Sequence, residues 1–213
     1  MAAGTAAALG PLLRSLPEPR DAPGKTPYAA LVTPATRLVV GVTVFAALAV
    51  SVIALPWPQV LALLPLGTGG VLAAVIDART TYLPRSLVWG ATAGLALCVG
   101  VVAALTGDWQ VPVLAAGGSL LVGGLFWLLW RTTGGFGFGD VRLALLAGGT
   151  AGTLGVSAAL WAALLGALVG AAWGLACQVS DRGAGRPPGP FPYGPSLVAG
   201  PYLWLVWTML PGW

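Results

Sequence analysis

Residues 38–76 read LVVGVTVFAALAVSVIALPWPQVLALLPLGTGGVLAAVI and contain no Asp, Glu, Lys or Arg. An α-helix needs about 20 apolar residues, at a rise of about 1.5 Å each, to cross a bilayer, so this run is long enough for two crossings. Pro56-Trp57-Pro58 interrupts it and predicts the turn between them. The stretch therefore indicates a membrane protein, in keeping with 57% hydrophobic and 8% charged residues in the whole chain.

The rest of the chain continues this pattern. Residues 86–130 suit two helices divided at 106–110, residues 143–180 suit two more with a turn at 152–155, and a last helix is expected over 195–210. We therefore predict an all-α polytopic membrane protein with about seven transmembrane helices. Residues 1–36 are expected to be a flexible cytoplasmic tail, and residues 37–213 the transmembrane domain.

The charged residues predict the orientation. If the helices alternate in direction, all ten basic residues fall on one side, which the positive-inside rule assigns to the cytoplasm. The N-terminus is then cytoplasmic and the protein lies in the cytoplasmic (inner) membrane. Asp77 ends the second predicted helix and Asp140 begins the fifth, so both aspartates are expected at the cytoplasmic face.

The composition excludes several kinds of chemistry. The chain has no histidine, and its only lysine, Lys25, lies in the expected tail. Cys98 and Cys177 lie apart inside apolar runs, without the spacing of a metal site, so buried thiols are expected. We expect no metal or cofactor. The basic residues form no stripe of the kind that binds nucleic acid, so no nucleic-acid partner is expected.

Asp140 follows the glycine-rich residues 134–139, in a chain that otherwise almost avoids charge. Glycine permits positive φ and close backbone approach, and irregular backbone at membrane depth is tolerated where it is buried in protein or lines a wet cavity. The helix after Asp140 spans about a dozen residues, roughly 18 Å, so we expect Asp140 to be recessed below the surface. Two carboxylates at one face predict a pair in which one activates water while the other, protonated, polarises a carbonyl.

Three motifs resemble those of one family. Residues 137–143, Gly-Phe-Gly-Asp-Val-Arg-Leu, resemble the Gly-x-Gly-Asp-x-Lys-Leu motif of the type IV prepilin peptidases, which are membrane aspartyl proteases. Asp77 followed by Pro84 is similar to the family's aspartate-then-Ile-Pro-Asn signature, and residues 191–200 are similar to its Pro-Phe-Gly-Pro segment. The resemblance covers roughly residues 60–210, in a short form without the family's cysteine-bearing cytoplasmic domain.

This resemblance implies that Asp77 and Asp140 are the catalytic pair of an aspartyl endopeptidase. It implies a prepilin-like or pseudopilin-like protein substrate, whose basic leader is cut at the cytoplasmic face just before an apolar segment. The residues that support the motifs are Pro84, Gly137, Gly139, Arg142, Pro192, Gly194 and Pro195. Arg142 and Arg85 depart from the family's usual lysine and asparagine.

Several alternatives stay open from the sequence. Arg142 could steady the aspartates or serve as a topology signal. A non-catalytic membrane scaffold or a small proton-linked transporter is the rival function, although no inverted repeat is visible. The sequence leaves undecided the substrate and its cleavage site, any N-methyltransferase activity, which aspartate carries the proton, and the oligomeric state. Gly166, Gly170 and Gly174 recur every four residues and predict close helix packing.

Overall fold

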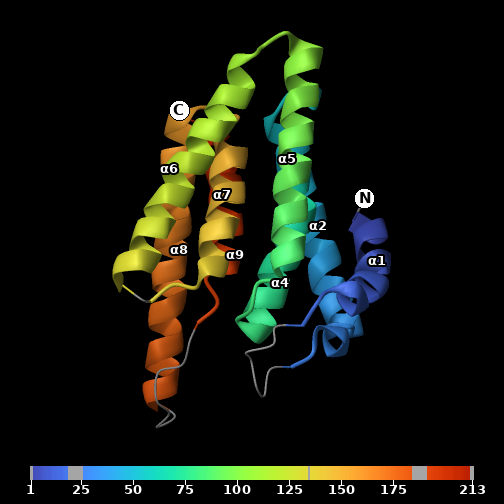
Figure 1. Ribbon diagram of the computed structural model, residues 1–213, viewed down its shortest axis with the longest axis vertical. Coiled ribbons are helices and arrows are strands. Elements are labelled where there is room, and N and C mark those ends of the chain that lie inside the picture. The colour runs from blue at the N-terminus through green and yellow to red at the C-terminus, as the bar shows by residue number, and fades with distance from the viewer. Residues whose placement is uncertain (1, 19–25, 134, 184–190, 212–213) are drawn as a thin grey trace.

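A computed structural model describes residues 2–18, 26–133, 135–183 and 191–211. Within these ranges every regular element is helical, and Figure 1 shows α6, α7, α8 and α9 gathered on one side of the molecule and α1, α2, α4 and α5 on the other. The elements are α1 (Ala2–Ser15), the 3-10 turn η1 (Tyr28–Leu31), α2 (Pro34–Ala54), α3 (Trp57–Pro65), the π-helical turn η2 (Leu66–Gly70), α4 (Val71–Thr80), α5 (Arg85–Thr106), α6 (Gln110–Thr133), α7 (Phe138–Gly152), α8 (Val156–Gly183) and α9 (Gly194–Thr208).

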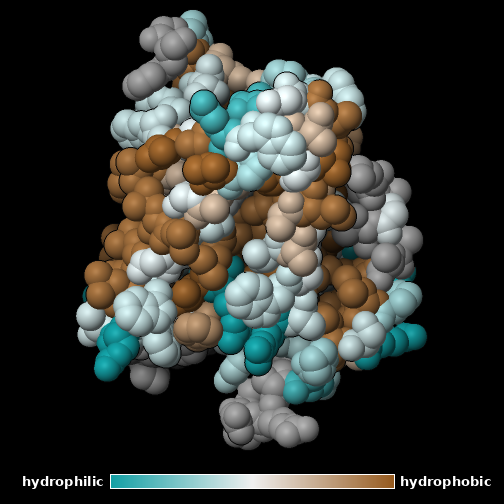
Figure 2. Space-filling model, turned by 45° about the horizontal axis from the view of Figure 1, so that its top comes forward, coloured by the Kyte–Doolittle hydropathy of each residue, from teal (hydrophilic) through white to brown (hydrophobic). Residues whose placement is uncertain are grey.

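Five stretches of helix are long and apolar enough to cross a membrane. In the described part of the chain they are Pro34–Ala54, Trp57–Thr80, Arg85–Thr106, Gln110–Thr133 and Val156–Gly183. Their outward faces carry large apolar side chains, and Figure 2 shows brown hydrophobic residues across the middle of the molecule, with teal polar residues toward its ends. The protein is an all-α polytopic membrane protein, as the sequence predicts.

The helix boundaries agree with the pattern of charges and turn residues. α2 ends at Ala54 and α3 begins at Trp57, so the Pro56-Trp57-Pro58 turn is confirmed. α5 and α6 are separated within the expected 106–110 segment. α7 and α9 have 15 residues each, about 22 Å of helix, and are shorter than the five long spans. Seven spans and a cytoplasmic N-terminus therefore stay predictions.

One irregularity lies inside the second long span. η2 is a π-helical turn between α3 and α4, and the sequence analysis did not foresee it. The turn inserts one extra residue, which changes the face that α4 presents to its neighbours. Its glycines also permit close contacts: a Cβ atom on Gly67 would lie 2.8 Å from the Tyr202 hydroxyl oxygen, and one on Gly69 would lie 2.8 Å from Cβ of Ala91.

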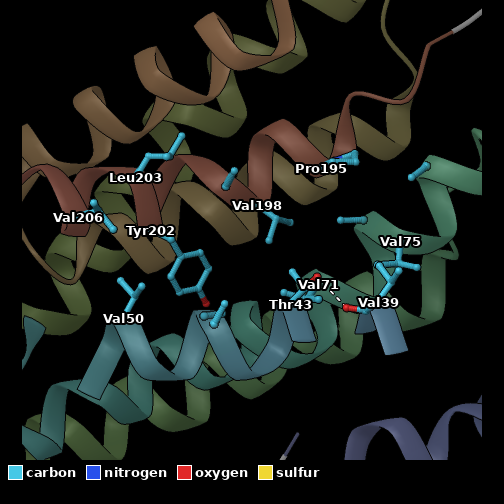
Figure 3. Close-up of a pocket in the computed structure, with 15 residues that line it drawn as sticks. Val39, Thr43, Val50, Val71, Val75, Pro195, Val198, Tyr202, Leu203 and Val206 are labelled. Carbon is cyan, nitrogen blue, oxygen red and sulfur yellow. Dashed lines mark hydrogen bonds between the residues drawn. The ribbon is translucent and has the colours of Figure 1, made fainter. Parts of the chain in front are cut away.

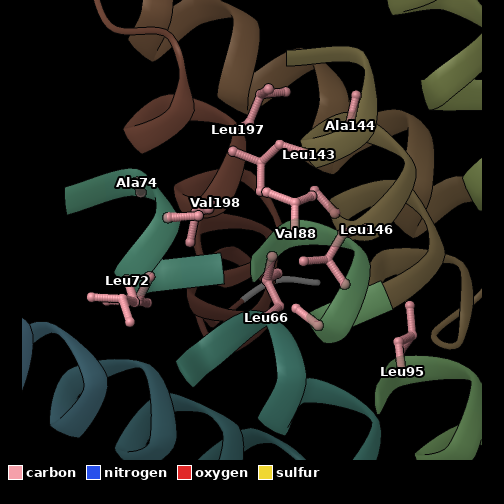
Figure 4. Close-up of a cluster of buried hydrophobic side chains, with 14 of the residues drawn as sticks. Leu66, Leu72, Ala74, Val88, Leu95, Leu143, Ala144, Leu146, Leu197 and Val198 are labelled. Carbon is pink, nitrogen blue, oxygen red and sulfur yellow. The ribbon is translucent and has the colours of Figure 1, made fainter. Parts of the chain in front are cut away.

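The buried core surrounds α7, which packs against α5, α6, α8 and α9. Figure 4 shows Leu143 and Leu146 of α7 beside Val88 of α5 and Leu197 of α9, all of them buried. Glycines bring α6 and α7 together, because a Cβ atom on Gly118 of α6 would overlap the backbone of α7. Small residues of this kind allow two helix backbones to pack closely in a membrane. α7 is thus a central helix, although it has only 15 residues.

The N-terminal segment differs from the expected flexible tail. Residues 2–15 form α1, which packs against α2, with the side chains of Leu9 and Leu13 buried one turn apart. This i, i+4 spacing places both leucines on one face, and burying them favours a helix even with Pro11 inside it. Met1 and residues 19–25, including Arg20 and Lys25, lie outside the described residues. The division into a tail and a transmembrane domain stays a prediction.

Candidate active site

Asp77 and Asp140 line the same cleft, which has a volume of about 600 Å³. The cleft lies at the end of the helix bundle where the loops that lead into α5, α7 and α9 meet, toward the bottom of Figure 1. The Asp77 side chain is buried, with 4% of its surface exposed, and Asp140 is half-buried. The structure therefore brings together the two carboxylates that the sequence analysis paired, in the setting of a partly enclosed polar cleft.

Asp77 lies near the C-terminal end of α4 and contacts the start of α9. Its Oδ2 atom accepts a hydrogen bond of 2.8 Å from the backbone N–H of Gly194. Gly194 is the first residue of α9, where the backbone N–H has no acceptor inside the helix and where the helix dipole is positive. A Cβ atom on Gly194 would lie 2.8 Å from Oδ2 and 3.2 Å from Cγ of Asp77, so this contact requires glycine.

Asp140 is held in a similar way at the start of α7. Its Oδ2 atom accepts a hydrogen bond of 2.9 Å from the backbone N–H of Gly137, the residue immediately before the helix. The Asp140 N–H in turn donates to the Gly137 carbonyl oxygen at 3.0 Å. Each carboxylate thus accepts a hydrogen bond from a glycine N–H at a helix N-terminus, an arrangement that favours negative charge and fixes orientation.

The motif glycines have different roles. A Cβ atom on Gly139 would lie only 3.0 Å from Cβ of Leu83, so this glycine lets the start of α7 approach the loop after α4. At Gly137 the closest atom would be 3.5 Å away, an ordinary contact. Among the described glycines, positive φ occurs at Gly107 and Gly155, outside this loop. Position 139 therefore requires glycine because the two chain segments approach closely there. Gly134, the first residue of the glycine-rich segment, lies outside the described residues.

The loop between α4 and α5 has a strained start and a rigid end. Thr81, which lines the cleft, has the left-handed φ of 56°, uncommon for a β-branched residue, and its N–H donates to the Asp77 carbonyl at 2.7 Å. Pro84 is buried and directly precedes α5. Arg85 is exposed at the first position of that helix. This turn ends the helix soon after Asp77 and directs the chain along the cleft.

The remaining motif residues lie around the cleft. The Arg142 guanidinium carbon is 4.7 Å from the centroid of the Phe138 ring, a cation–π contact at the cleft wall. Pro195 is the second residue of α9, a position where the missing N–H leaves no helical bond unmade. Pro192 lines a neighbouring pocket beside Cys177 rather than the cleft itself. Of the supporting residues, Gly137, Gly139 and Arg142 line the cleft itself, whereas Pro84, Pro192, Gly194 and Pro195 do not.

An aromatic cluster behind the carboxylates was missed by the sequence analysis. The Tyr193 ring is buried and lies 5.2 to 5.8 Å, between centroids, from the rings of Phe126, Phe136 and Phe191. Burial, and then the Asp140 carboxylate, raise the pKa of the Tyr193 phenol. A usable signal was present, because Phe136, Phe191 and Tyr193 all lie within or beside the quoted motifs.

The glycines of α8 position this cluster. A Cβ atom on Gly170 would overlap the Tyr193 ring, and one on Gly174 would lie 3.2 Å from Phe191. Gly166, one turn earlier, would place a Cβ atom 2.9 Å from the Ser196 carbonyl oxygen of α9. The predicted close packing is therefore confirmed for the stripe, but only Gly166 packs against a helix backbone. Gly170 and Gly174 instead admit aromatic rings from the segment before α9.

A second residue that the sequence analysis missed comes from the N-terminal segment. Tyr28 is 1% exposed, and its backbone N–H donates a hydrogen bond of 2.6 Å to Oε1 of Glu18. Burial, and then the Glu18 and Asp77 carboxylates, raise the pKa of its phenol to about 12. The segment before α2 thus reaches the surroundings of Asp77, which nothing in its sequence indicated.

The chemistry available in the cleft is that of carboxylates and backbone groups. No group of three or more His, Cys, Asp or Glu side chains among the described residues is arranged to hold a metal ion. A carboxylate pair can exchange protons with a bound water and a substrate carbonyl. One backbone N–H group holds each acid, that of Gly194 for Asp77 and that of Gly137 for Asp140.

The fold and the cleft define a polytopic helical membrane protein with two carboxylates at one end of the helix bundle. The chain belongs to the type IV leader peptidase family, whose sequence model matches residues 64–175, more than half of the chain, from α3 to α8. It is therefore a membrane protease of the prepilin-type leader peptidase class. The match includes both aspartates, and the third motif at 191–200 lies beyond it. No curated protein and no solved structure matches the chain.

Proposed function

We propose that this protein is an aspartyl endopeptidase that removes the leader of prepilin-like or pseudopilin-like substrates, with Asp77 and Asp140 as its catalytic pair. One observation carries the proposal: both carboxylates line one cleft, and each is oriented by a glycine N–H at a helix N-terminus. This geometry supports a shared task, since a pair that acts on one substrate must be held in a fixed relative position.

The proposed reaction uses water and two proton transfers. One aspartate, ionised, removes a proton from a water molecule while the other, protonated, donates a hydrogen bond to the scissile carbonyl oxygen. The water oxygen attacks the carbonyl carbon and forms a tetrahedral intermediate. The intermediate then collapses, the C–N bond breaks, and the leaving amine takes a proton from the pair. Because the two groups share protons, their titration belongs to the pair.

The charges near the cleft support a cytoplasmic active site. Described basic residues lie at the helix ends on the cleft side of the bundle: Arg79, Arg85, Arg131, Arg142 and Arg182. Asp108 lies at the opposite end, between α5 and α6. The positive-inside rule places the arginine-bearing end in the cytoplasm, so the cleft would meet a basic leader where it leaves the cytoplasmic membrane.

The test is cleavage of a candidate precursor that carries a basic leader before an apolar segment, co-expressed with the protein in membranes. Asp77→Asn and Asp140→Asn keep side-chain size but remove the ionisable group, so each should abolish cleavage at unchanged protein level. Asp108→Asn is the matched control, because its acid is exposed at the far end of the bundle. Cleavage that survives either active-site substitution would contradict the paired mechanism and favour a non-catalytic scaffold or a proton-linked transporter.

A further inference from the structure

An apolar groove of about 420 Å³ lies between α2, α4 and α9 (Figure 3). It is separate from the polar cleft, and its lining is almost entirely aliphatic. Figure 3 shows the two long walls, α2 and α9, with Val39, Val75 and Pro195 at one end and Val50 and Val206 at the other. The groove therefore runs along the two helices rather than across them.

The spacing of the lining residues fits a helix as the occupant. α2 contributes Val39, Thr43, Ala46, Ala47 and Val50; four of them, Val39, Thr43, Ala46 and Val50, follow one another at intervals of four, three and four residues. α9 contributes residues over the same length of 11 positions, from Pro195 to Val206. Each wall thus runs for about 16 Å, or three helical turns. An alternation of three and four residues is the spacing of a seam against which another helix packs.

The polar groups of the groove already have partners. The Thr43 hydroxyl donates to the Val39 carbonyl oxygen at 2.8 Å, and the Tyr202 hydroxyl donates to the Leu63 carbonyl oxygen at 3.3 Å. Both hydroxyl hydrogens are therefore already used within the protein, and a polar occupant would lose hydrogen bonds to water on entering this largely aliphatic groove. Its occupant must present an apolar surface.

The size of the lining side chains also favours a helix. Ala46, Ala74, Ala78 and Ala199 line the groove from all three of its helices. Small side chains let a second helix backbone come close, which is the main source of helix–helix affinity within a membrane.

The groove ends at the proposed catalytic turn. Ala74 and Ala78 lie on the same turns of α4 as Asp77, and Pro195 directly follows Gly194, whose N–H binds the Asp77 carboxylate. The contact between Gly194 and Asp77 thus separates the apolar groove from the polar cleft. A helix lying in the groove would have one terminus beside this contact.

We infer that the groove between α2, α4 and α9 binds the apolar segment of the substrate as an α-helix, with the scissile bond just beyond its N-terminal end and above Asp77. This inference rests on the proposed function for the nature of the substrate, and it adds the place where the membrane-embedded part of the substrate docks. α2, with an exposed face and few buried residues, is then the wall that contacts substrate rather than bulk lipid.

Disulfide trapping tests the docking site directly. The protein carries Asp140→Asn to retain substrate, Cys98→Ala and Cys177→Ala to remove its own thiols, and one new cysteine at Ala46 or at Ala199. Val42→Cys is the matched control, because Val42 is on the exposed surface of α2 and does not line the groove. The precursor carries single cysteines through its apolar segment.

We expect cross-links at positions 46 and 199, recurring every three to four positions along the precursor, and little at position 42. Equal yields at all three sites, or none at 46 and 199, would overturn the inference. Capture of a phospholipid with a photoreactive acyl chain at position 46, without precursor cross-links, would make the groove a lipid site and would also overturn it.

A kinetic readout separates docking from chemistry. In the active protein, Ala46→Trp should fill the groove and raise KM for the precursor about tenfold, with kcat little changed. Val42→Trp should leave both constants near wild type, and equal constants for the two variants would contradict the groove assignment. If the wild type cleaves no precursor, the proposed function fails, but trapping in the Asp140→Asn protein still decides whether the groove binds an apolar helix.

Discussion

The backbone N–H of Gly194 donates a 2.8 Å hydrogen bond to Oδ2 of Asp77, joining residues 117 positions apart in the chain. Gly137 makes the equivalent contact with Asp140, so both carboxylates are oriented by backbone groups at the start of a helix. Backbone donors cannot rotate away as side chains can, and they favour the ionised form of an acid. Gly194 and Gly137 are therefore positioning residues, and substitution of Gly194, where a Cβ atom would meet the Asp77 carboxylate, should affect turnover more than stability.

Gly194→Ala should lower kcat strongly. The added Cβ atom would lie 2.8 Å from Oδ2 and 3.1 Å from Cβ of Asp77, so the carboxylate must move. A displacement of about 1 Å in a catalytic group can reduce turnover by about 100-fold. Rates of precursor cleavage in membranes measure the effect, with Gly117→Ala as the control because its Cβ atom would meet nothing within 4 Å. Wild-type turnover in Gly194→Ala would show that the contact does not position Asp77.

Gly139→Ala should impair activity through contact with the neighbouring loop. The new Cβ atom would lie 3.0 Å from Cβ and 3.1 Å from Cδ1 of Leu83, and would push the start of α7, with Asp140, away from the loop after α4. Leu83→Ala removes the outer part of this overlap and should restore part of the lost cleavage rate in the double variant. Such coupling is expected of residues in contact. If the losses of the two single variants simply add in the double variant, the contact between positions 139 and 83 is not the cause of the impaired activity.

Gly170→Ala should reduce activity from a position outside the cleft. Its Cβ atom would overlap the Tyr193 ring and lie 2.9 Å from Oγ of Ser196, so the segment that carries Gly194 would shift. We expect a loss of kcat of about tenfold or more, with a folded protein in detergent. Gly100→Ala, also within a long span, has nothing within 4 Å of its Cβ atom and should behave as wild type. Equal cleavage rates in Gly170→Ala and Gly100→Ala would show that Gly170 does not position the segment that carries Gly194.

Tyr28 should make stability depend on pH in the alkaline range. Its phenol has a folded-state pKa raised to about 12, against an ordinary value of 10.0. Between these values the unfolded chain binds fewer protons than the folded protein, so the free energy of unfolding falls as pH rises from about 10 to about 12. Tyr28→Phe should flatten this fall, as measured by thermal unfolding in detergent at successive pH values. An unchanged slope would show that Tyr28 does not titrate in this way.

Much of the architecture follows from the sequence because a bilayer leaves few choices. A spanning segment must satisfy its own backbone, so long charge-free runs become helices such as α2 and α5, and Pro56-Trp57-Pro58 separates two of them. The helix order places Asp77 and Asp140 at one end of the bundle. The motifs then identify the family, and the sequence match over residues 64–175 confirms it.

Other features depend on which helix faces pack against one another, and in a membrane protein the hydropathy of the sequence does not identify those faces. A residue that faces lipid and a residue that faces the core are both apolar, so the sequence did not reveal η2, the burial of Leu9 and Leu13 in α1, or the packing of Tyr193 against three phenylalanine rings. The contact of Gly194 with Asp77 likewise requires α9 to lie against α4. Composition and charge thus determine that this chain crosses the membrane and where its acids lie, whereas tertiary packing decides what holds those acids, since their partners lie on helices that are distant in the chain.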